Sequence, residues 1–414
     1  MADILAEEFR VTMPATQNRT ATFRHALVLL LGSCLPVMAA VLIAPVLPQI
    51  MQHFAGVPNA ELLVPLALTI PALAVGLISP LAGMIVDRFG RKRLLLASMV
   101  LYAAVGTAPL YLQSLPAIIG SRVGVGVAEA FIMTICTSLI ADYFSGALRE
   151  RYLAQQTMWA SIAATLFFGI GGALGEAGWR TPFWMYAVAL LLLPVMAIML
   201  WEPRPDSTVH AAEGPSSAKR KFPIKPVLGI CAVTLGSSIA FYTLPVHMGF
   251  VLQVIGTTSP AKIGMAAAIS SVATVAGAVA FRRLSALGVP LNLAIAFGAL
   301  GGGFLAVSAA SDFNAVVIGA AFSGFGAGLV LPTLLTWLMR QLRFEERGRG
   351  AGAFTASFFV GQFVCPLVVL GLNKSLGGLG SALNGLGWIA VGATVLAMAS
   401  AIVLRPGGVT NPNA

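Results

Sequence analysis

Long apolar runs alternate with short polar or charged segments along the whole chain. A helix needs about 20 apolar residues to cross a bilayer. Twelve runs of suitable length occur, each bounded by charges, Pro and Gly clusters or polar turns. The predicted spans are 25–49, 61–84, 94–112, 116–141, 152–174, 182–201, 226–252, 260–281, 289–310, 314–339, 348–371 and 380–404.

The composition supports this interpretation. The chain of 414 residues is 58% hydrophobic and only 10% charged, with a mean hydropathy of +0.89. Such values indicate a polytopic membrane protein. The net charge of +10 would suggest nucleic acid in a soluble protein, but here the basic residues lie in short segments between apolar runs. We therefore expect membrane lipids, and no nucleic acid, as partners.

The basic residues also predict an orientation. Every Lys and Arg falls on one side of the predicted membrane except Arg122, inside a span, and Arg180, Lys262 and Lys374 on the other side. Short basic loops are retained in the cytoplasm. Both termini are therefore expected to be cytoplasmic, in a multi-pass protein of a bacterial-type inner membrane. Residues 1–24 lack the pattern of a cleaved signal peptide.

A polar break divides the chain near its middle. Residues 202–225, EPRPDSTVHAAEGPSSAKRKFPIK, are too polar to span. They predict a cytoplasmic linker between two six-helix halves; an amphipathic helix on the membrane surface and a regulatory site are alternative interpretations. The predicted organisation is a tail at 1–24, halves at 25–201 and 226–404 joined by the linker, and a tail at 405–414.

The segment 83–93, GMIVDRFGRKR, lies between the second and third spans. Its charges would be costly in hydrocarbon, so it is a loop at the membrane face. At this length it is similar to the Gly-x-x-x-Asp-Arg-x-Gly-Arg-Lys/Arg signature of the major facilitator superfamily. The resemblance implies a conformational latch formed by Gly83, Asp87, Arg88, Gly90 and Arg91.

Each part of this signature has a physical interpretation. Gly83 is expected to let two helix backbones approach closely, and Gly90 permits a tight turn. The resemblance implies that Asp87 faces the N-terminus of the eleventh span, near Gly348, when the cytoplasmic side is shut. A generic basic loop is the alternative, but it explains neither the glycines nor the carboxylate.

The two halves resemble repeats of one another. The signature has a weakened echo at 277–288, GAVAFRRLSALG, where Phe281 stands in the place of Asp87. Parallel repeats of this kind place a substrate cavity at their interface near the middle of the membrane. The expected fold is thus an all-α membrane protein with twelve transmembrane helices, in two six-helix pseudo-repeat bundles around a central cavity.

Further stretches sharpen the family resemblance. Pro45 and Pro48 are similar to the family's paired prolines in the first span, and SRVGVGVAEA at 121–130 is similar to a pattern of proton-coupled members. GIGGALGEAGWRTPFWMY at 169–186 is close to a junction of drug-efflux members. The Gly-Pro pair expected before that junction in antiporters is absent; Phe167 and Phe168 stand there instead.

Ionisable residues inside spans are the strongest candidates for chemistry, because hydrocarbon penalises them. Arg122 lies in the fourth span and Glu129 seven residues deeper, so the two project from nearly the same face, about 10 Å apart along the axis. Together they predict a site that holds a charged substrate or exchanges a proton. The alternative is a polar group that only positions helices.

His247 follows Pro245, whose missing donor opens the helix locally. It is the third candidate for proton coupling, or else a hydrogen-bonded neighbour of another helix. The four cysteines lie in apolar runs and are interpreted as small core residues. Candidate residues of the substrate cavity, for which packing is the alternative role, are Phe241, Tyr242, Trp337 and Gln362.

The hypothesis that follows is a secondary active transporter, with proton-coupled efflux of small amphipathic compounds such as drugs or sugars, by alternating access. The alternatives are a proton-coupled uptake symporter for a small metabolite and a membrane sensor or lipid-handling protein on the same fold. No catalytic cluster, nucleotide loop or metal-ligand spacing is found. We expect no enzyme activity, cofactor or metal, and a monomer whose partners are a small-molecule substrate, protons and lipids.

Overall fold

The computed structural model describes residues 21–203, 222–343 and 346–403. Within this part it has 12 helical segments that are long and apolar enough to cross a membrane. The predicted number of spans and the all-α membrane class are therefore confirmed. Most of the predicted tails and linker, and the side chain of Asp87, lie outside the described part.

The N-terminal half starts with a span made of short pieces and continues with five longer ones. Its elements are α1 (Phe23–Gly32), α2 (Leu35–Val41), η1 (Ala44–Val46), α3 (Leu47–His53), α4 (Ala60–Phe89), α5 (Arg91–Thr107), η2 (Ala108–Leu110), α6 (Leu115–Tyr143), α7 (Gly146–Gly175), η3 (Thr181–Ala187) and α8 (Val188–Met199).

The C-terminal half has six spans that are more regular. Its elements are α9 (Ile224–Val254), α10 (Pro260–Leu284), η5 (Ser285–Leu287), α11 (Val289–Ser308), α12 (Phe313–Gln341), α13 (Arg347–Leu376) and α14 (Leu379–Val403).

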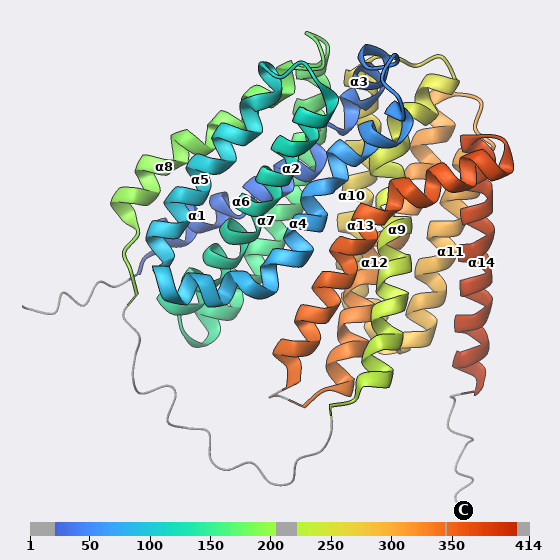
Figure 1. Ribbon diagram of the computed structural model, residues 1–414. Coiled ribbons are helices and arrows are strands. Elements are labelled where there is room, and N and C mark those ends of the chain that lie inside the picture. The colour runs from blue at the N-terminus through green and yellow to red at the C-terminus, as the bar shows by residue number, and fades with distance from the viewer. Residues whose placement is uncertain (1–20, 204–221, 344–345, 404–414) are drawn as a thin grey trace, which may run out of the picture.

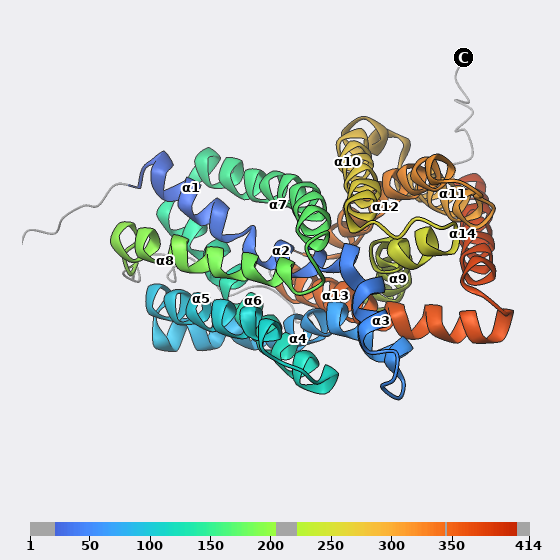
Figure 2. The ribbon, with the colours of Figure 1, turned by 90° about the horizontal axis from the view of Figure 1, so that it is seen from above.

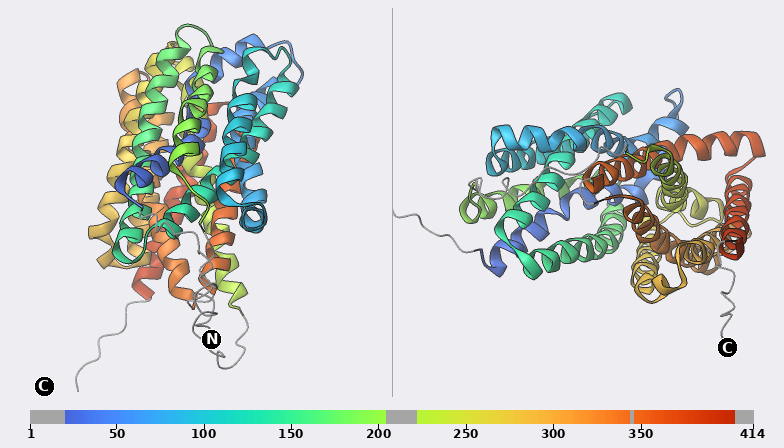
Figure 3. Two further views of the ribbon diagram at one scale, coloured as in Figure 1. Left: turned by 90° about the vertical axis from the view of Figure 1, so that its left-hand side faces the viewer. Right: turned by 90° about the horizontal axis from the view of Figure 1, so that it is seen from below.

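The two halves stand side by side as separate bundles (Figure 1). Seen along the membrane normal, α4 and α13 lie where the bundles meet, as do α7 and α10 (Figure 2). We call the end of the bundle with Arg88, Arg91, Lys92 and Arg93 the basic face, and the other end the opposite face. The bundles diverge toward the basic face, at the bottom of Figure 1, and the view from below in Figure 3 shows them as two groups of helices.

The first span is broken because prolines interrupt it. Pro36, Pro45 and Pro48 each stand in the first turn of a separate piece, which suits a residue without a backbone N–H. Each break leaves carbonyl groups without helical partners. A side chain from another helix is therefore needed to satisfy those that are buried.

Small residues bring the second and fourth spans close together. A Cβ atom at Gly126 of α6 would lie 2.4 Å from the carbonyl oxygen of Pro71 on α4, so only glycine fits there. This close approach is the usual way helices associate in membranes. It fixes the face of α6 that carries Arg122 and Glu129 against α4.

The described hydrogen bonds between the two halves lie from the middle of the helices to the opposite face. Thr165 Oγ1 on α7 donates to Ser271 Oγ on α10 at 3.0 Å. Nearer the opposite face, Gly172 and Gly264 bring the same helices together so closely that a Cβ atom on either would lie 2.5 Å from a carbonyl oxygen of the other helix. This α7–α10 seam closes the opposite face.

Candidate functional site

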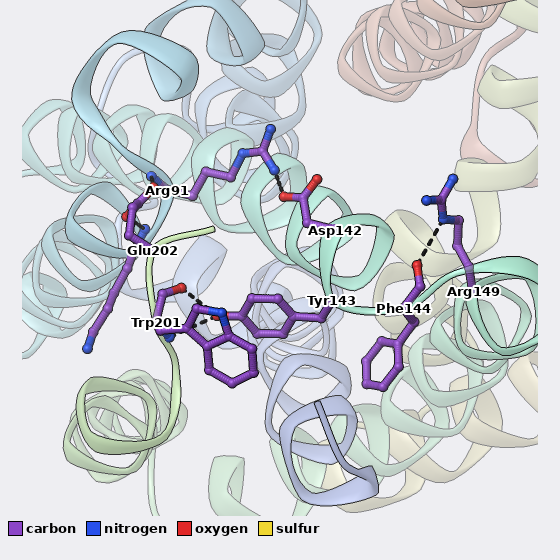
Figure 4. A network of polar contacts seen from close by, with 8 residues as sticks. Arg91, Asp142, Tyr143, Phe144, Arg149, Trp201 and Glu202 are labelled. Atoms are coloured by element: carbon purple, nitrogen blue, oxygen red, sulfur yellow. Dashed lines mark hydrogen bonds and ion pairs between the residues drawn. The ribbon is translucent and has the colours of Figure 1, made fainter. Parts of the chain in front are cut away.

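The segment 83–93 was expected to be a loop, but it is helical on both sides of Gly90, because α4 continues to Phe89, beyond its apolar part, and α5 begins at Arg91. This junction is tied to its own half. Gly90 has φ +88°, a left-handed conformation that glycine adopts without strain, and it starts α5. The Glu202 carboxylate accepts hydrogen bonds from the backbone N–H of Arg91 at 2.5 Å and of Lys92 at 2.8 Å (Figure 4). A carboxylate there complements the positive end of the helix. The Arg91 guanidinium also forms an ion pair with Asp142 at the end of α6.

Aromatic and backbone contacts extend this network along the basic face. The Tyr143 hydroxyl donates to the Trp201 carbonyl at 2.5 Å, and the two rings stack with centroids 4.1 Å apart. Arg149 Nε on α7 donates to the Phe144 carbonyl at 3.1 Å (Figure 4). The ends of α5, α6, α7 and α8 therefore form one connected layer.

The predicted latch residues are only partly brought together. The expected close approach at Gly83 is not present in this conformation, because no atom of another helix lies within 4 Å of a Cβ placed there. The halves diverge on this face, which explains the open space. Arg88 is exposed and lies over the ring of its neighbour Phe89 at 5.7 Å. The contact expected for Asp87 falls outside the described residues.

Arg122 is completely buried and holds three elements of its own half together. Its Nη2 donates to the Ala39 carbonyl at 2.9 Å, its Nε to the Ala67 carbonyl at 3.2 Å and its Nη1 to the Tyr186 hydroxyl at 2.6 Å. None of these three bonds involves Glu129. The predicted joint action of Arg122 and Glu129 therefore does not rest on a hydrogen bond between their side chains in this structure.

The two carbonyls are those that the helices leave unsatisfied. Ala67 lies four residues before Pro71, which has no N–H to offer it. Ala39 lies in the last turn of α2, where carbonyls have no helical partner. The guanidinium can donate to both in a fixed fork and keeps its charge in an apolar site. This geometry explains why an arginine, and no smaller donor, is buried at this position.

Glu129 faces a cavity of about 150 Å³ between the two halves, which we call the central cavity. The side chain is 5% exposed, and its Oε1 has no hydrogen-bond partner. The cavity walls come from α2, α4 and α6 on one side and α9 and α13 on the other. Its polar and aromatic lining is formed by Glu129, Tyr242, Phe358, Phe359 and Gln362.

The residues predicted for the substrate cavity separate into two groups. Tyr242 and Gln362 line the central cavity, and Phe241 contacts its edge through the rings of Tyr242 at 5.3 Å and Phe358 at 5.9 Å. Trp337 packs instead among apolar side chains of the C-terminal half, near Leu338, and is not part of the lining of the central cavity. Sequence reasoning missed Phe358 and Phe359, because only their apolar character distinguishes them in the sequence, and that does not indicate a cavity.

His247 lines a second cavity of about 230 Å³, nearer the opposite face, together with Glu61 and Asn373. Its Nδ1 lies 3.0 Å from the Thr243 carbonyl and must carry the proton, because a carbonyl only accepts. In the neutral ring Nε2 is then an acceptor. His247 and Glu129 therefore belong to two different cavities at the interface.

Glu176, at the end of α7, crosses to the C-terminal half. Its Oε1 accepts from the Ser259 hydroxyl at 2.5 Å and from the backbone N–H of Ala261 at 3.0 Å, at the start of α10. These two bonds hold the pKa of the Glu176 carboxyl below its ordinary value. The opposite face is thus closed by an exposed carboxylate on a helix N-terminus.

Other features do not add a reactive centre. The four cysteines are buried and free, as expected for small core residues. Among the described residues, no group of three or more His, Cys, Asp and Glu side chains comes together. A hollow of about 440 Å³ near Ser308 and Asn384 lies within the C-terminal half, so a motion between the halves does not expose it alternately to the two sides.

Two bundles with a small cavity at their interface define the class of an alternating-access membrane transporter. Residues 29–258 match the Major Facilitator Superfamily, and the chain belongs to this family. The recognition of this family from the 83–93 signature is therefore confirmed.

Relatives cover both drug resistance and metabolite transport. The chain is 28% identical over 286 residues to the 3-(3-hydroxy-phenyl)propionate transporter of Escherichia coli K12, covering 66% of this chain and 68% of the relative. It is 24% identical to the class C tetracycline resistance protein of Escherichia coli, covering 90% and 94% of the two chains.

The solved structures that resemble it confirm the fold. A bacterial homologue of the human lysosomal transporter Spinster, in an inward-facing and occupied conformation, has a TM-score of 0.69 at 18% identity and covers 91% of this chain and 94% of its own. A D-xylose-proton symporter has a TM-score of 0.72 at 15% identity, covering 93% and 98%.

Proposed function

We propose that the protein is a proton-coupled secondary transporter that expels small amphipathic compounds by alternating access between the two halves. The observation that supports this most is the Glu129 carboxylate, buried at the interface of the halves with one oxygen unpartnered. An ionised carboxylate without a partner is costly away from water. Glu129 therefore takes up a proton or a cation there, and a movement of the halves changes the water that reaches it.

Arg122 supports coupling from a fixed position. It stays charged in its ring of carbonyl and hydroxyl acceptors and lies about 10 Å along α6 from Glu129. Because its bonds anchor α2 and α4 to α6, it keeps the walls of the central cavity in register. We assign His247, in the second cavity, as a further proton acceptor toward the opposite face.

We also assign the basic face to the cytoplasm, since short basic loops are retained on that side. The bonds of the α7–α10 seam close the opposite face, so the described conformation is the inward-facing one. In the outward-facing state the signature loop would meet α13 as the resemblance implies, with Asp87 against its N-terminus.

Proton flux in proteoliposomes tests the proposal. The purified protein is reconstituted with a pH-sensitive dye inside, and phenethylammonium, tetracycline, a quinolone or 3-(3-hydroxyphenyl)propionate is added to either side. We expect at least one compound to move protons in the direction opposite to its own movement. A compound that moves together with protons would instead show an uptake symporter. No proton flux with any compound of this panel would contradict coupled transport.

A further inference from the structure

We propose that the central cavity recognises a small aromatic ammonium, a cation with N–H donors attached to one ring, and excludes carboxylates. The proposal deepens the proposed function, because it takes this cavity as the binding site of the transported compound. It rests on which polar groups line the cavity, which do not, and how much space they enclose.

The polar lining of the central cavity includes two acceptors that have no donor. Oε1 of Glu129 and Oε1 of Gln362 are both buried and both without a hydrogen-bond partner. Gln362 is only 2% exposed, so water does not satisfy it freely. A ligand with hydrogen-bond donors would satisfy both of these oxygens. When Glu129 is ionised, the bond that it accepts from a cationic donor is charge-assisted and therefore stronger.

Among the residues that the structure describes, no cationic side chain lines the central cavity to receive an anion. The buried cation nearest along α6, Arg122, is not in its lining, and its Nε, Nη1 and Nη2 all donate to groups of its own half. When Glu129 is ionised, a carboxylate in this cavity would face it without a cation to offset the repulsion. The aryl propionate of the Escherichia coli relative is therefore the wrong charge for this site.

The aromatic walls favour the same ligand. The rings of Tyr242 and Phe358 lie 6.1 Å apart at 64°, and those of Phe358 and Phe359 lie 5.6 Å apart at 72°. Edge-to-face neighbours of this kind accept a further ring, and their faces attract a cation within about 6 Å. The volume of about 150 Å³ is that of a cavity which holds a single benzene ring.

Equilibrium binding of three matched probes tests the proposal. Phenethylammonium, 2-phenylethanol and phenylacetate share one ring and a similar length but carry a cation, a neutral hydroxyl and an anion. Titration calorimetry on the full-length protein in lipid nanodiscs at neutral pH, with no gradient, measures each affinity. We expect phenethylammonium to bind about 10- to 100-fold more tightly than 2-phenylethanol, the range of a charge-assisted hydrogen bond, and phenylacetate to bind most weakly.

Two variants connect the preference to Glu129. In Glu129→Gln the advantage of the ammonium over the alcohol should fall below about threefold, whereas Glu61→Gln, which removes a carboxylate from the second cavity, should leave it unchanged. Glu129→Asp keeps the charge and should keep most of the preference. This variant keeps the test valid if Glu129→Gln disturbs the fold. Tighter binding of phenylacetate, no binding of phenethylammonium at millimolar concentration, or a preference that survives Glu129→Gln would overturn the proposal.

The outcome is separable from that of the proposed function. If the protein binds phenethylammonium through Glu129 but moves no compound across a membrane, the proposed binding site stands and the proposed transport function is contradicted. A protein that transports a panel compound with protons but binds phenylacetate best keeps the transport function and contradicts this site.

Discussion

Glu176 of the N-terminal half accepts a hydrogen bond of 2.5 Å from Ser259, the residue that also caps α10 of the C-terminal half. The N-cap hydroxyl and the backbone N–H of Ala261 thus hold a carboxylate from the other half on the positive end of the helix. This is a direct polar contact between the halves at the opposite face, and a separation of α7 from α10 there would break it.

Removal of this charge should loosen the closed face. We expect Glu176→Gln to shift the protein toward conformations open at the opposite face, because a neutral amide binds a helix N-terminus more weakly. Double electron–electron resonance between spin labels on α7 and α10 measures the shift as a longer inter-label distance. An unchanged distance distribution in Glu176→Gln would show that the seam alone holds the face closed.

The same contact predicts a pH dependence. The pKa of Glu176 is lowered from its ordinary value of 4.5, so the bond is at full strength above that pH and is lost only as the pH falls through the lower value. Its two partners, the Ser259 hydroxyl and the Ala261 backbone N–H, do not titrate in this range. Distances across the α7–α10 seam should therefore be constant down to about pH 5 and lengthen only in stronger acid. Lengthening between pH 7 and pH 5 would point to another titrating group.

The glycine seam predicts a second effect on closure. Gly172→Ala places a methyl group 2.5 Å from the Pro260 carbonyl oxygen of α10, so the halves must separate there or the variant must distort. We expect reduced transport and a longer α7–α10 distance with the protein still folded. Gly169→Ala on the same helix is the matched control, since nothing lies within 4 Å of its Cβ position. Equal activity of both variants would contradict the role of the seam.

Arg122 is predicted to be important for stability as well as coupling. Arg122→Ala leaves the Ala39 and Ala67 carbonyls and the Tyr186 hydroxyl without their donor, and should cost about 2–5 kcal/mol of unfolding free energy. Arg122→Lys should lose less and couple transport better than the Ala variant. Tyr186→Phe, which removes a single bond, should be the mildest of the three. Thermal unfolding in detergent ranks them, and a fully stable, fully coupled Ala variant would contradict both roles.

The spans, and the place of the signature segment 83–93 at the ends of two of them, were predictable because hydrocarbon leaves few choices. A run of apolar residues in lipid must satisfy its own backbone, and a segment as charged as 83–93 cannot enter the bilayer. The expected loop was wrong, because the two helices extend past the apolar runs and leave only Gly90 between them. The positive φ angle of Gly90 likewise follows from its position in the tight turn between two helices. These features depend on local sequence and on the solvent, and both are visible in the chain itself.

The partners in space were not predictable in the same way. Glu202 was assigned to the linker, but it caps α5 more than a hundred residues earlier in the chain. Arg122 was expected to act with Glu129, although the spacing of Ala67 and Pro71 already marked a carbonyl in need of a donor. Trp337 was predicted to line the substrate cavity but lies among apolar neighbours, because the facing of an aromatic residue depends on packing with other helices.

The central claim is that Glu129 carries the proton that drives transport. Glu129→Gln keeps the shape and hydrogen bonding of the side chain but cannot titrate. In proteoliposomes with an imposed pH difference, using the panel compound that gives the largest flux, we expect this variant to exchange compound between the two sides yet build no gradient of it. Glu150→Gln, which removes an exposed carboxylate near the start of α7, should behave as the wild type. If Glu129→Gln still moves the compound against its gradient in proportion to the pH difference, Glu129 is not the coupling residue, and His247 in the second cavity becomes the next one to test.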